Sequence, residues 1–343
     1  MAAGKSCSAI QGPGVDISEL AKSVAAGERR GLARAITLVE SVREDHRTQA
    51  AELLQSLPKT NEALRIGLSG TPGVGKSTFI ESFGMMLVTA GLKVAVLAVD
   101  PSSTRSGGSI LGDKTRMDRL ARHPNAFIRP SPSQTHLGGV ARRSREAVAL
   151  CEGAAFDVVL IETVGVGQSE TVVAEMSDAF LLLLAPAGGD ELQGVKRGIM
   201  EIADMIIVNK ADGDLRATAT RTCADYAGAL RLLRKRPQDP EGFPKAMMVS
   251  ALEESGLAEV WDDLQALVAW RKKSGFWAAN RAAQARYWFA EEVRNGLLAD
   301  LEKPSVREAM AEFADGVVSG DWTSTTAAQE FLKKLRASEA AKS

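Results

Sequence analysis

The sequence has few of the residues on which disulfide-stabilised domains and common metal sites depend. It has 343 residues but only three cysteines, Cys7, Cys151 and Cys223, and only three histidines. An odd, scattered set of cysteines is a poor disulfide framework, and neither residue type recurs at a metal-ligand spacing. We therefore expect incidental or buried thiols in a reducing compartment, and no zinc or di-iron centre held by histidine.

Long apolar runs and an excess of one charge are also missing. No run of about 18 uninterrupted apolar residues occurs, so no transmembrane helix is expected. The 42 Lys and Arg nearly balance the 43 Asp and Glu, so no global field favours nucleic acid or an anionic membrane. The first residues lack an apolar core of signal-peptide length, and the first arginine is Arg29, unlike a mitochondrial transit peptide. We expect a cytoplasmic protein that binds neither nucleic acid nor membrane.

The middle of the chain alternates short apolar runs with helical stretches. The runs are 64–69, 93–99, 126–129, 156–162, 178–185, 205–210 and 245–251. Most are continuous, as expected for parallel strands covered on both faces. The alternation predicts an α/β fold with a mostly parallel sheet of about seven strands, flanked by helices.

Both ends of the chain have a helical pattern. We predict an N-terminal helical extension at 1–61, a central α/β domain at 62–255 and a C-terminal helical arm at 256–343. An apolar stripe with spacings of three and four lies in the arm: Ala282, Ala285, Phe289, Val293, Leu297 and Leu301. The arm is either a helical layer packed on the same domain or, as we favour, an element for self-association.

One segment predicts phosphate binding. Gly70-Thr71-Pro72-Gly73-Val74-Gly75-Lys76-Ser77 matches the pattern G-x-x-x-x-G-K-[ST]. The glycines let backbone N–H groups point at phosphate oxygens, Lys76 neutralises the β- and γ-phosphates, and the Ser77 hydroxyl is placed to ligate Mg²⁺. The helix that starts near Lys76 and continues through Thr78 adds its positive dipole end. We predict that residues 70–78 bind a nucleotide.

Two later segments predict that the base is guanine. Asn209-Lys210-Ala211-Asp212 matches N-K-x-D after the sixth strand. A carboxylate at Asp212 can accept hydrogen bonds from guanine N1–H and the 2-amino group, and adenine offers no such pair of donors. Asn209 and Lys210 would brace the loop and cover the base. Ser250-Ala251-Leu252 follows the seventh strand, where a backbone N–H would meet guanine O6.

Acidic residues at two strand ends predict the metal site. Glu162-Thr163-Val164-Gly165 stands where GTPases commonly have Asp-x-x-Gly; Glu162 would hold Mg²⁺ and the Gly165 N–H would sense the γ-phosphate. Asp100 ends the second strand and would act on Mg²⁺ through water or on the attacking water, unless it only caps a turn. Lys76, Asp100 and Glu162 are therefore the predicted catalytic residues, and Ser77, Asp100 and Glu162 the predicted metal ligands.

Two Gly-rich charged loops are candidate switches. Residues 107–116, with Asp113, Lys114 and Arg116, are placed to sense phosphate. Residues 187–196 form a loop that simple nucleotide hydrolysis does not need, and it would report the nucleotide state to a partner. Each could instead be a solvated surface loop.

Together these motifs resemble the metallochaperone-type P-loop GTPases of the SIMIBI class, and most closely the MeaB/ArgK branch associated with methylmalonyl-CoA mutase. The class is marked by Glu where most GTPases have Asp in the third motif. The strings that carry the resemblance are GTPGVGKST (70–78), VDPSS (99–103), GGSILGDKTRM (107–117), ETVGVGQSE (162–170), the 188–196 loop and NKAD (209–212).

The resemblance implies a Mg²⁺-dependent GTPase, often homodimeric through C-terminal helices. It implies a chaperone of adenosylcobalamin-dependent methylmalonyl-CoA mutase, or of a related acyl-CoA mutase, that gates cofactor delivery and protects the mutase from inactivation. Asp190 and Lys196 would contact the mutase. No DxHxxG-type signature occurs, so we expect no cobalamin bound directly by this chain. Slow intrinsic hydrolysis is expected, because the residue after Gly165 is Val166 and not a glutamine that could orient the attacking water. Gln168 lies two residues further on.

Two other functions on the same fold stay open. An ATP-using kinase would need an acceptor pocket and a base, for which no motif is evident. A metal-insertion GTPase for nickel or cobalt delivery would carry Cys or His clusters, which the sequence lacks. Competition between GTP and ATP tests the first alternative, and stoichiometric Ni²⁺ or Zn²⁺ binding tests the second.

Overall fold

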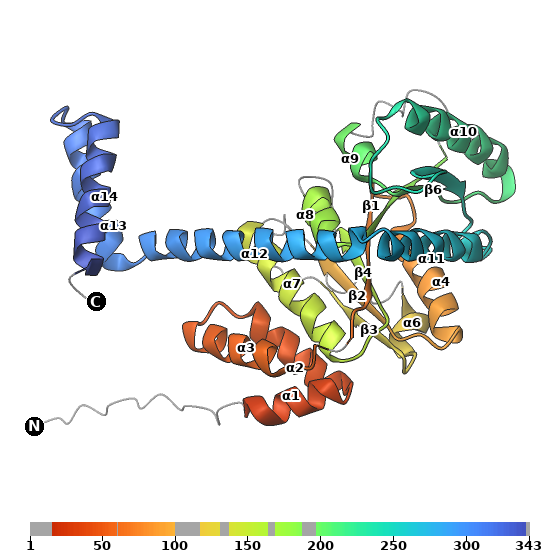
Figure 1. Cartoon of the computed structure of the whole chain (residues 1–343), viewed down its shortest axis with the longest axis horizontal. Coiled ribbons are helices and arrows are strands. Elements are labelled where there is room, and N and C mark those ends of the chain that lie inside the picture. Colours follow the sequence, from red (N-terminus) through yellow and green to blue (C-terminus); the bar gives the residue numbers. More distant parts are fainter. Residues whose placement is uncertain are drawn as a thin grey trace, which may run out of the picture. The chain divides into compact units, whose positions relative to one another are not determined.

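The computed structural model describes residues 16–59, 61–99, 117–130, 137–163, 169–186 and 197–340. A seven-stranded sheet lies at the centre, in the order β3-β2-β4-β1-β5-β6-β7, and the pairings between neighbouring strands are parallel (Figure 1). The strands are β1 Leu64–Gly70, β2 Val94–Val99, β3 Ala126–Arg129, β4 Val158–Thr163, β5 Ala179–Leu184, β6 Met205–Val208 and β7 Lys245–Met248. The predicted α/β class is confirmed, and each predicted apolar run overlaps one strand, with β1 and β4 each ending one residue beyond the predicted run.

Helices connect these parallel strands, as the crossovers of a parallel sheet require. They are α4 Lys76–Thr89, α6 Asp118–Arg122, α7 Leu137–Gly153, α8 Ser169–Met176, α9 Arg197–Ile202 and α10 Arg216–Leu232, with the short 3₁₀ turn η2 at Gly213–Leu215. Because the strands run the same way, the carboxyl ends of β1, β4, β6 and β7 lie at one edge of the sheet. This carboxyl edge is where ligands bind in open α/β folds.

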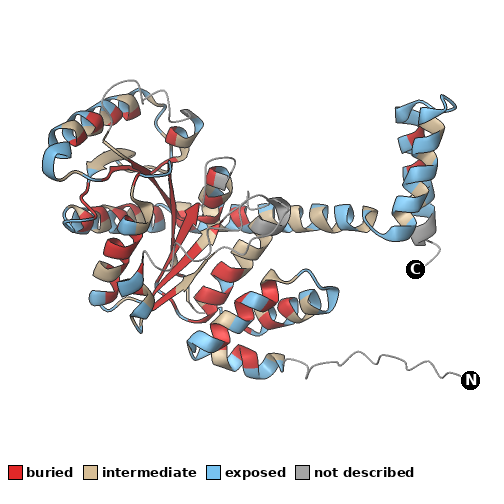
Figure 2. Cartoon of the chain, turned by 180° about the vertical axis from the view of Figure 1, so that it is seen from behind, coloured by how far each residue is buried: buried red, intermediate tan, exposed pale blue. Residues whose placement is uncertain are grey.

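Alternate residues of the strands form a core with the helices on one face. Ile66 and Leu68 of β1 lie in one buried cluster with Phe79 and Phe83 of α4. The Phe79 and Phe83 rings stack with centroids 5.3 Å apart. The opposite face packs on α8, since a Cβ added at Gly67 would come within 3.0 Å of its Val173 side chain. Figure 2 shows the strands at the centre of the sheet as buried, whereas β7 at its edge is mostly half-buried.

Three helices precede the sheet: α1 Ile17–Ala25, α2 Arg29–Glu40 and α3 Glu44–Ser56. The Asp16 carboxylate caps α1 by accepting from the Glu19 N–H at 3.1 Å, as N-cap residues do. Leu32, Ile36 and Val39 give α2 a buried face, and α2 packs against α7. The described part of the predicted N-terminal helical extension is therefore divided among three helices.

The helices after the sheet are α11 Leu257–Lys273, α12 Phe276–Leu301, α13 Pro304–Val318 and α14 Ser324–Ala340. The chain divides into two compact units, Met1–Ala282 and Ala283–Ser343. In the first unit, Val260, Leu264 and Leu267 of α11 join the core of the sheet. In the second, the Phe313 ring packs between Trp322 and Phe331, with centroids 6.2 and 5.9 Å away. The three-part division at 61 and 255 stays a prediction.

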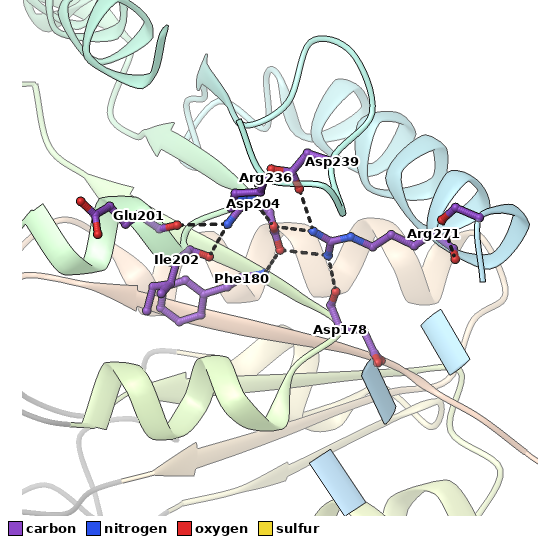
Figure 3. Close-up of polar contacts among 9 residues, drawn as sticks. Asp178, Phe180, Glu201, Ile202, Asp204, Arg236, Asp239 and Arg271 are labelled. Carbon is purple, nitrogen blue, oxygen red and sulfur yellow. Dashed lines mark hydrogen bonds and ion pairs between the residues drawn. The ribbon is translucent and has the colours of Figure 1, made fainter. Parts of the chain in front are cut away.

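A network of buried ion pairs fastens α11 to the other edge of the sheet, where β5 and β6 begin (Figure 3). Arg271 donates to the carboxylates of Asp204 at 2.6 Å and Asp239 at 3.2 Å. Arg236 donates to the same two carboxylates, at 2.8 and 2.5 Å. Burial alone would lower the pKa of Arg271, but the two carboxylates outweigh it and raise that pKa above its ordinary value.

Candidate functional site

The phosphate-binding segment joins β1 to α4. Gly75 is the N-cap of α4 with φ +90°, a left-handed conformation that favours glycine. A Cβ at Gly75 would also lie 2.7 Å from the Asn209 amide nitrogen, so another residue would push the two segments apart. The Lys76 ammonium donates to the Gly70 carbonyl at 2.7 Å. Val74 is buried, while Thr71, Pro72, Gly73 and Thr78 are exposed.

Asn209 connects three parts of the predicted site. Its Nδ2 donates to the carbonyls of Val74 at 3.0 Å and Gly75 at 3.4 Å. Its Oδ1 accepts from the Ala251 N–H at 3.0 Å. Only 1% of Asn209 is exposed, so these bonds are made away from competing water. One side chain thus ties the phosphate loop, the N-K-x-D segment and the 250–252 segment together.

Lys210 and Asp212 are held in place by the same two segments. Lys210 has φ +58° and its ammonium donates to the Gly73 carbonyl at 2.7 Å. The Ser250 hydroxyl donates to the Asp212 carboxylate and accepts from the Glu253 N–H at 3.0 Å. Asp212 therefore keeps a fixed direction. Leu252 is exposed, and the Ala251 N–H, a predicted donor to guanine O6, donates to Asn209 in this structure.

Glu162 lies near the end of β4, between β1 and β2. It is paired in register with Leu68 and Ala98 and is buried. Side chains alternate along a strand, so Glu162 shares the face of Leu160, which belongs to the core cluster with Phe79 of α4. Glu162 and Ser77, in the first turn of α4, are thus oxygen donors on one face at the carboxyl edge. Oxygen donors of this kind suit Mg²⁺, which binds through few protein ligands and substrate phosphates.

Several predicted site residues lie outside the described residues. They are Asp100, Asp113, Lys114, Arg116, Gly165, Gln168, Asp190 and Lys196. Among the predicted site residues that are described, Lys76, Asn209, Lys210, Asp212 and Ser250 lie in or contact the phosphate loop and the two segments that follow β6 and β7.

The described residues give no other candidate centre for metal or thiol chemistry. Among them, no three His, Cys, Asp or Glu side chains gather where they could hold a metal ion. Burial raises the pKa of the Cys151 thiol well above its ordinary value, which suppresses the reactive thiolate. Within the same part of the chain, no helix is long and apolar enough to cross a membrane.

Two polar residues with partners in the site were missed by sequence reasoning. Glu81 and Ser82 lie on α4 between the buried residues Ile80 and Phe83, and both are buried. Ser82 donates to the Ala251 carbonyl at 2.6 Å. The available signal was a polar pair interrupting the apolar face of a helix, because buried polar groups generally have hydrogen-bond partners.

Comparison with known proteins places these features in a family. Residues 32–305 match the family model described as methylmalonyl-CoA mutase-associated GTPase MeaB. The chain is 48% identical to the Escherichia coli GTPase ArgK, with 83% of this chain and 87% of the relative covered. It is 47% identical to the mouse methylmalonic aciduria type A homolog, mitochondrial, with 93% and 80% covered.

A solved structure resembles the whole chain as well. The crystal structure of LAO/AO transport system kinase shares 35% sequence identity with a TM-score of 0.72, and the match covers 94% of this chain and 99% of that one. The similarity therefore extends beyond the phosphate-binding motif.

Proposed function

The chain belongs to the MeaB family of methylmalonyl-CoA mutase-associated GTPases, and we propose that it couples Mg²⁺-dependent hydrolysis of GTP to a chaperone function for that mutase in the cytoplasm. The products are GDP and phosphate. The observation that carries the proposal is Asn209, because its hydrogen bonds join the phosphate loop to both guanine segments. If residues 209–212 were only a turn at the end of β6, Asn209 would not need these hydrogen bonds to the other two segments.

The chemistry follows from the positions of the chain's own groups. Water attacks the γ-phosphate in line, and Lys76 neutralises the charge that gathers on the phosphate oxygens. Ser77 and Glu162, with Asp100, would hold Mg²⁺, which supplies further neutralisation when bound. The N-terminus of α4 adds its dipole to the same anion. Removal of Mg²⁺ by a chelator is expected to abolish hydrolysis.

The partner in this proposal is the adenosylcobalamin-dependent methylmalonyl-CoA mutase or a related acyl-CoA mutase. The chain acts as its chaperone: it gates delivery of the cofactor and protects the mutase from inactivation. Cobalamin stays with the mutase and is not bound by this chain. The family description and the mouse relative's name support the choice of partner.

The proposal includes a homodimer formed by the C-terminal helices. Phe289, Val293 and Leu297 lie four residues apart on α12 and are 72%, 48% and 64% exposed. At that spacing they share one helix face. Exposed apolar residues gathered on one face mark a site of protein association, and the aromatic residue suits the core of such an interface.

The test is to incubate the chain with purified mutase in the presence of a non-hydrolysable GTP analogue, GDP or no nucleotide, and to measure capture and GTP hydrolysis. We expect capture that depends on the nucleotide, and faster hydrolysis with mutase than without. Capture that is absent under all three conditions would contradict the mutase role. Transfer of phosphate to an acceptor other than water would favour a kinase instead.

A further inference from the structure

Two buried polar residues on α4 interrupt an apolar helix face. Glu81 is 9% exposed and Ser82 is 6% exposed, between the fully buried Ile80 and Phe83. A buried hydroxyl or carboxylate without partners is costly, so such residues persist where they make hydrogen bonds. The partners of both belong to segments distant in sequence, and both lead to the turn formed by residues 250–255.

Ser82 fixes this turn directly. Its hydroxyl donates to the Ala251 carbonyl at 2.6 Å. The N–H of Ala251 donates to Asn209, so both polar backbone groups of Ala251 are held by side chains. The turn itself is closed by reciprocal backbone hydrogen bonds of 3.0 Å between Ser250 and Ser255. The orientation of the turn is therefore set by the helix that carries Lys76 and Ser77.

Glu81 fixes the turn through a second route. Its carboxylate accepts from the N–H groups of Arg119 at 2.8 Å and Leu120 at 3.3 Å, at the start of α6. The Arg119 guanidinium donates to the Glu254 carboxylate at 2.9 Å. Leu120 is fully buried in the core, which seats α6 against α4. The side chain of Arg119 thereby connects α6 to Glu254, near the end of the 250–255 turn.

We propose that Glu81, Ser82 and Arg119 are positioning residues for guanine specificity. They hold the 250–255 turn and, through Ser250, the Asp212 carboxylate at a set place relative to the phosphate loop. The inference rests on the proposed function, in which Asp212 binds the guanine edge. Discrimination by hydrogen bonding is strong only when the site's polar groups are fixed, because a wrong base then leaves them unpaired. Loosening the turn weakens base contacts and leaves phosphate contacts in place.

The experiment measures dissociation constants of the full chain for GDP and ADP by competition. For Ser82→Ala we expect the preference for GDP over ADP to fall about tenfold, with ADP affinity unchanged. Glu81→Ala should lower the preference for GDP over ADP in the same way. Glu81→Gln should have a preference between those of Glu81→Ala and the wild type, because it keeps one acceptor oxygen. Arg119→Ala should change the preference by no more than about fivefold, since its ion pair with Glu254 is exposed.

The control is Asp157→Ala. The Asp157 carboxylate accepts from the Lys93 N–H at 2.7 Å, an exposed carboxylate–backbone bond just before β2 and β4, at the amino edge of the sheet. This variant should lose thermal stability while its preference for GDP over ADP stays that of the wild type.

The inference is overturned if folded Ser82→Ala and Glu81→Ala keep the wild-type preference, or if they lose GDP and ADP affinity in parallel. Should either variant fail to fold, a double-mutant cycle of Arg119→Ala and Glu254→Ala tests the inference instead. If the Arg119–Glu254 ion pair positions the turn, the two substitutions must be coupled in their effect on the ratio of GDP to ADP affinity. No coupling in that ratio would then overturn the inference. A wild-type chain without preference for GDP would instead contradict the proposed function itself.

Discussion

At the scale of single residues, the nucleotide site depends on side chains that hydrogen bond to backbone. Asn209 donates to two carbonyls of the phosphate loop and accepts from Ala251. Lys210 donates to Gly73 and Lys76 to Gly70. These bonds join side chains to the phosphate loop, to the end of β1 and to the 250–255 turn. The bonds of Asn209 hold the loop most firmly, because a buried amide is expensive to leave unpaired.

Lys76→Ala is expected to remove hydrolysis while leaving the fold intact. The ammonium neutralises charge on the β- and γ-phosphates, and loss of one such stabilising group costs about 100-fold or more in rate. Phosphate release in a single turnover measures the effect. Thr89→Ala, at the other end of α4 where the hydroxyl bonds only the Met85 carbonyl in the described contacts, is the control. Hydrolysis by Lys76→Ala within a few-fold of the wild type would refute the role of the phosphate loop.

Some residue-scale features were accessible from sequence and others were not. A bracing role for Asn209 and Lys210 could be proposed from the motif, and both side chains donate to the phosphate loop; their role in nucleotide binding stays a prediction. Ser82 and Glu81 could not be assigned, since their partners lie 169 and 38 residues away. Only the folded chain brings Ala251 and Arg119 to them. The approach of Asn209 to Gly75 is likewise a consequence of strand order.

At the scale of elements, continuous apolar runs predicted the strands well. A strand buried on both faces has no polar alternation to disguise it, and β5, Ala179–Leu184, is buried at every residue. The strand ends were predicted less well: the sixth run was expected to reach residue 210, but β6 ends at Val208, whereas β1 and β4 continue one residue beyond their runs. Asn209 leaves the strand to make its side-chain bonds. Strand order was not predicted, because periodicity carries no information on which strands pair.

The ion-pair network at the amino edge of the sheet was also invisible in the sequence. Its members come from three separate segments, and each charge alone looks like an ordinary surface residue. In the structure the side chains of Arg271 and Asp204 are only 5% and 7% exposed. Such a pair is sensitive to loss of one partner, because the remaining charge stays buried and uncompensated.

Arg271→Ala is therefore expected to lower the free energy of unfolding by about 3–5 kcal/mol. Urea unfolding of the full chain measures this change. The control is Arg122→Ala, whose ion pair with Asp118 is 79% and 58% exposed and which should cost less than about 1 kcal/mol. If the two variants lost equal stability, the network would not be what fastens α11 to the sheet.

At the scale of the whole molecule, the predicted arm contains, among the described residues, the helix with the most exposed large apolar side chains. Phe289, Val293, Leu297 and Leu298 of α12 are each about half exposed or more. Full burial of such side chains contributes about 1.5–3 kcal/mol each, which favours the proposed association. The balanced charge of the chain, 42 basic and 43 acidic residues, suits association with protein rather than nucleic acid.

The double variant Phe289→Lys with Leu297→Lys is expected to raise the dimer dissociation constant by about 100-fold or more, because two charges replace two apolar contacts. Sedimentation equilibrium measures the change. Asn295→Lys adds a charge on another face of α12 and should leave the dimer intact. A double variant that associates as the wild type does would show that this stripe is not the interface.

The central claim is that the chain binds guanine nucleotides through one connected site. The most direct test is displacement of labelled GDP from the full chain by GTP and by ATP in the presence of Mg²⁺. The account predicts that GTP displaces GDP at near-stoichiometric concentrations, that ATP does not, and that Asp212→Ala loses GDP affinity by roughly 10- to 100-fold, the cost of hydrogen bonds to a charged group. Displacement by ATP as effective as by GTP, or unchanged GDP affinity in Asp212→Ala, would contradict it.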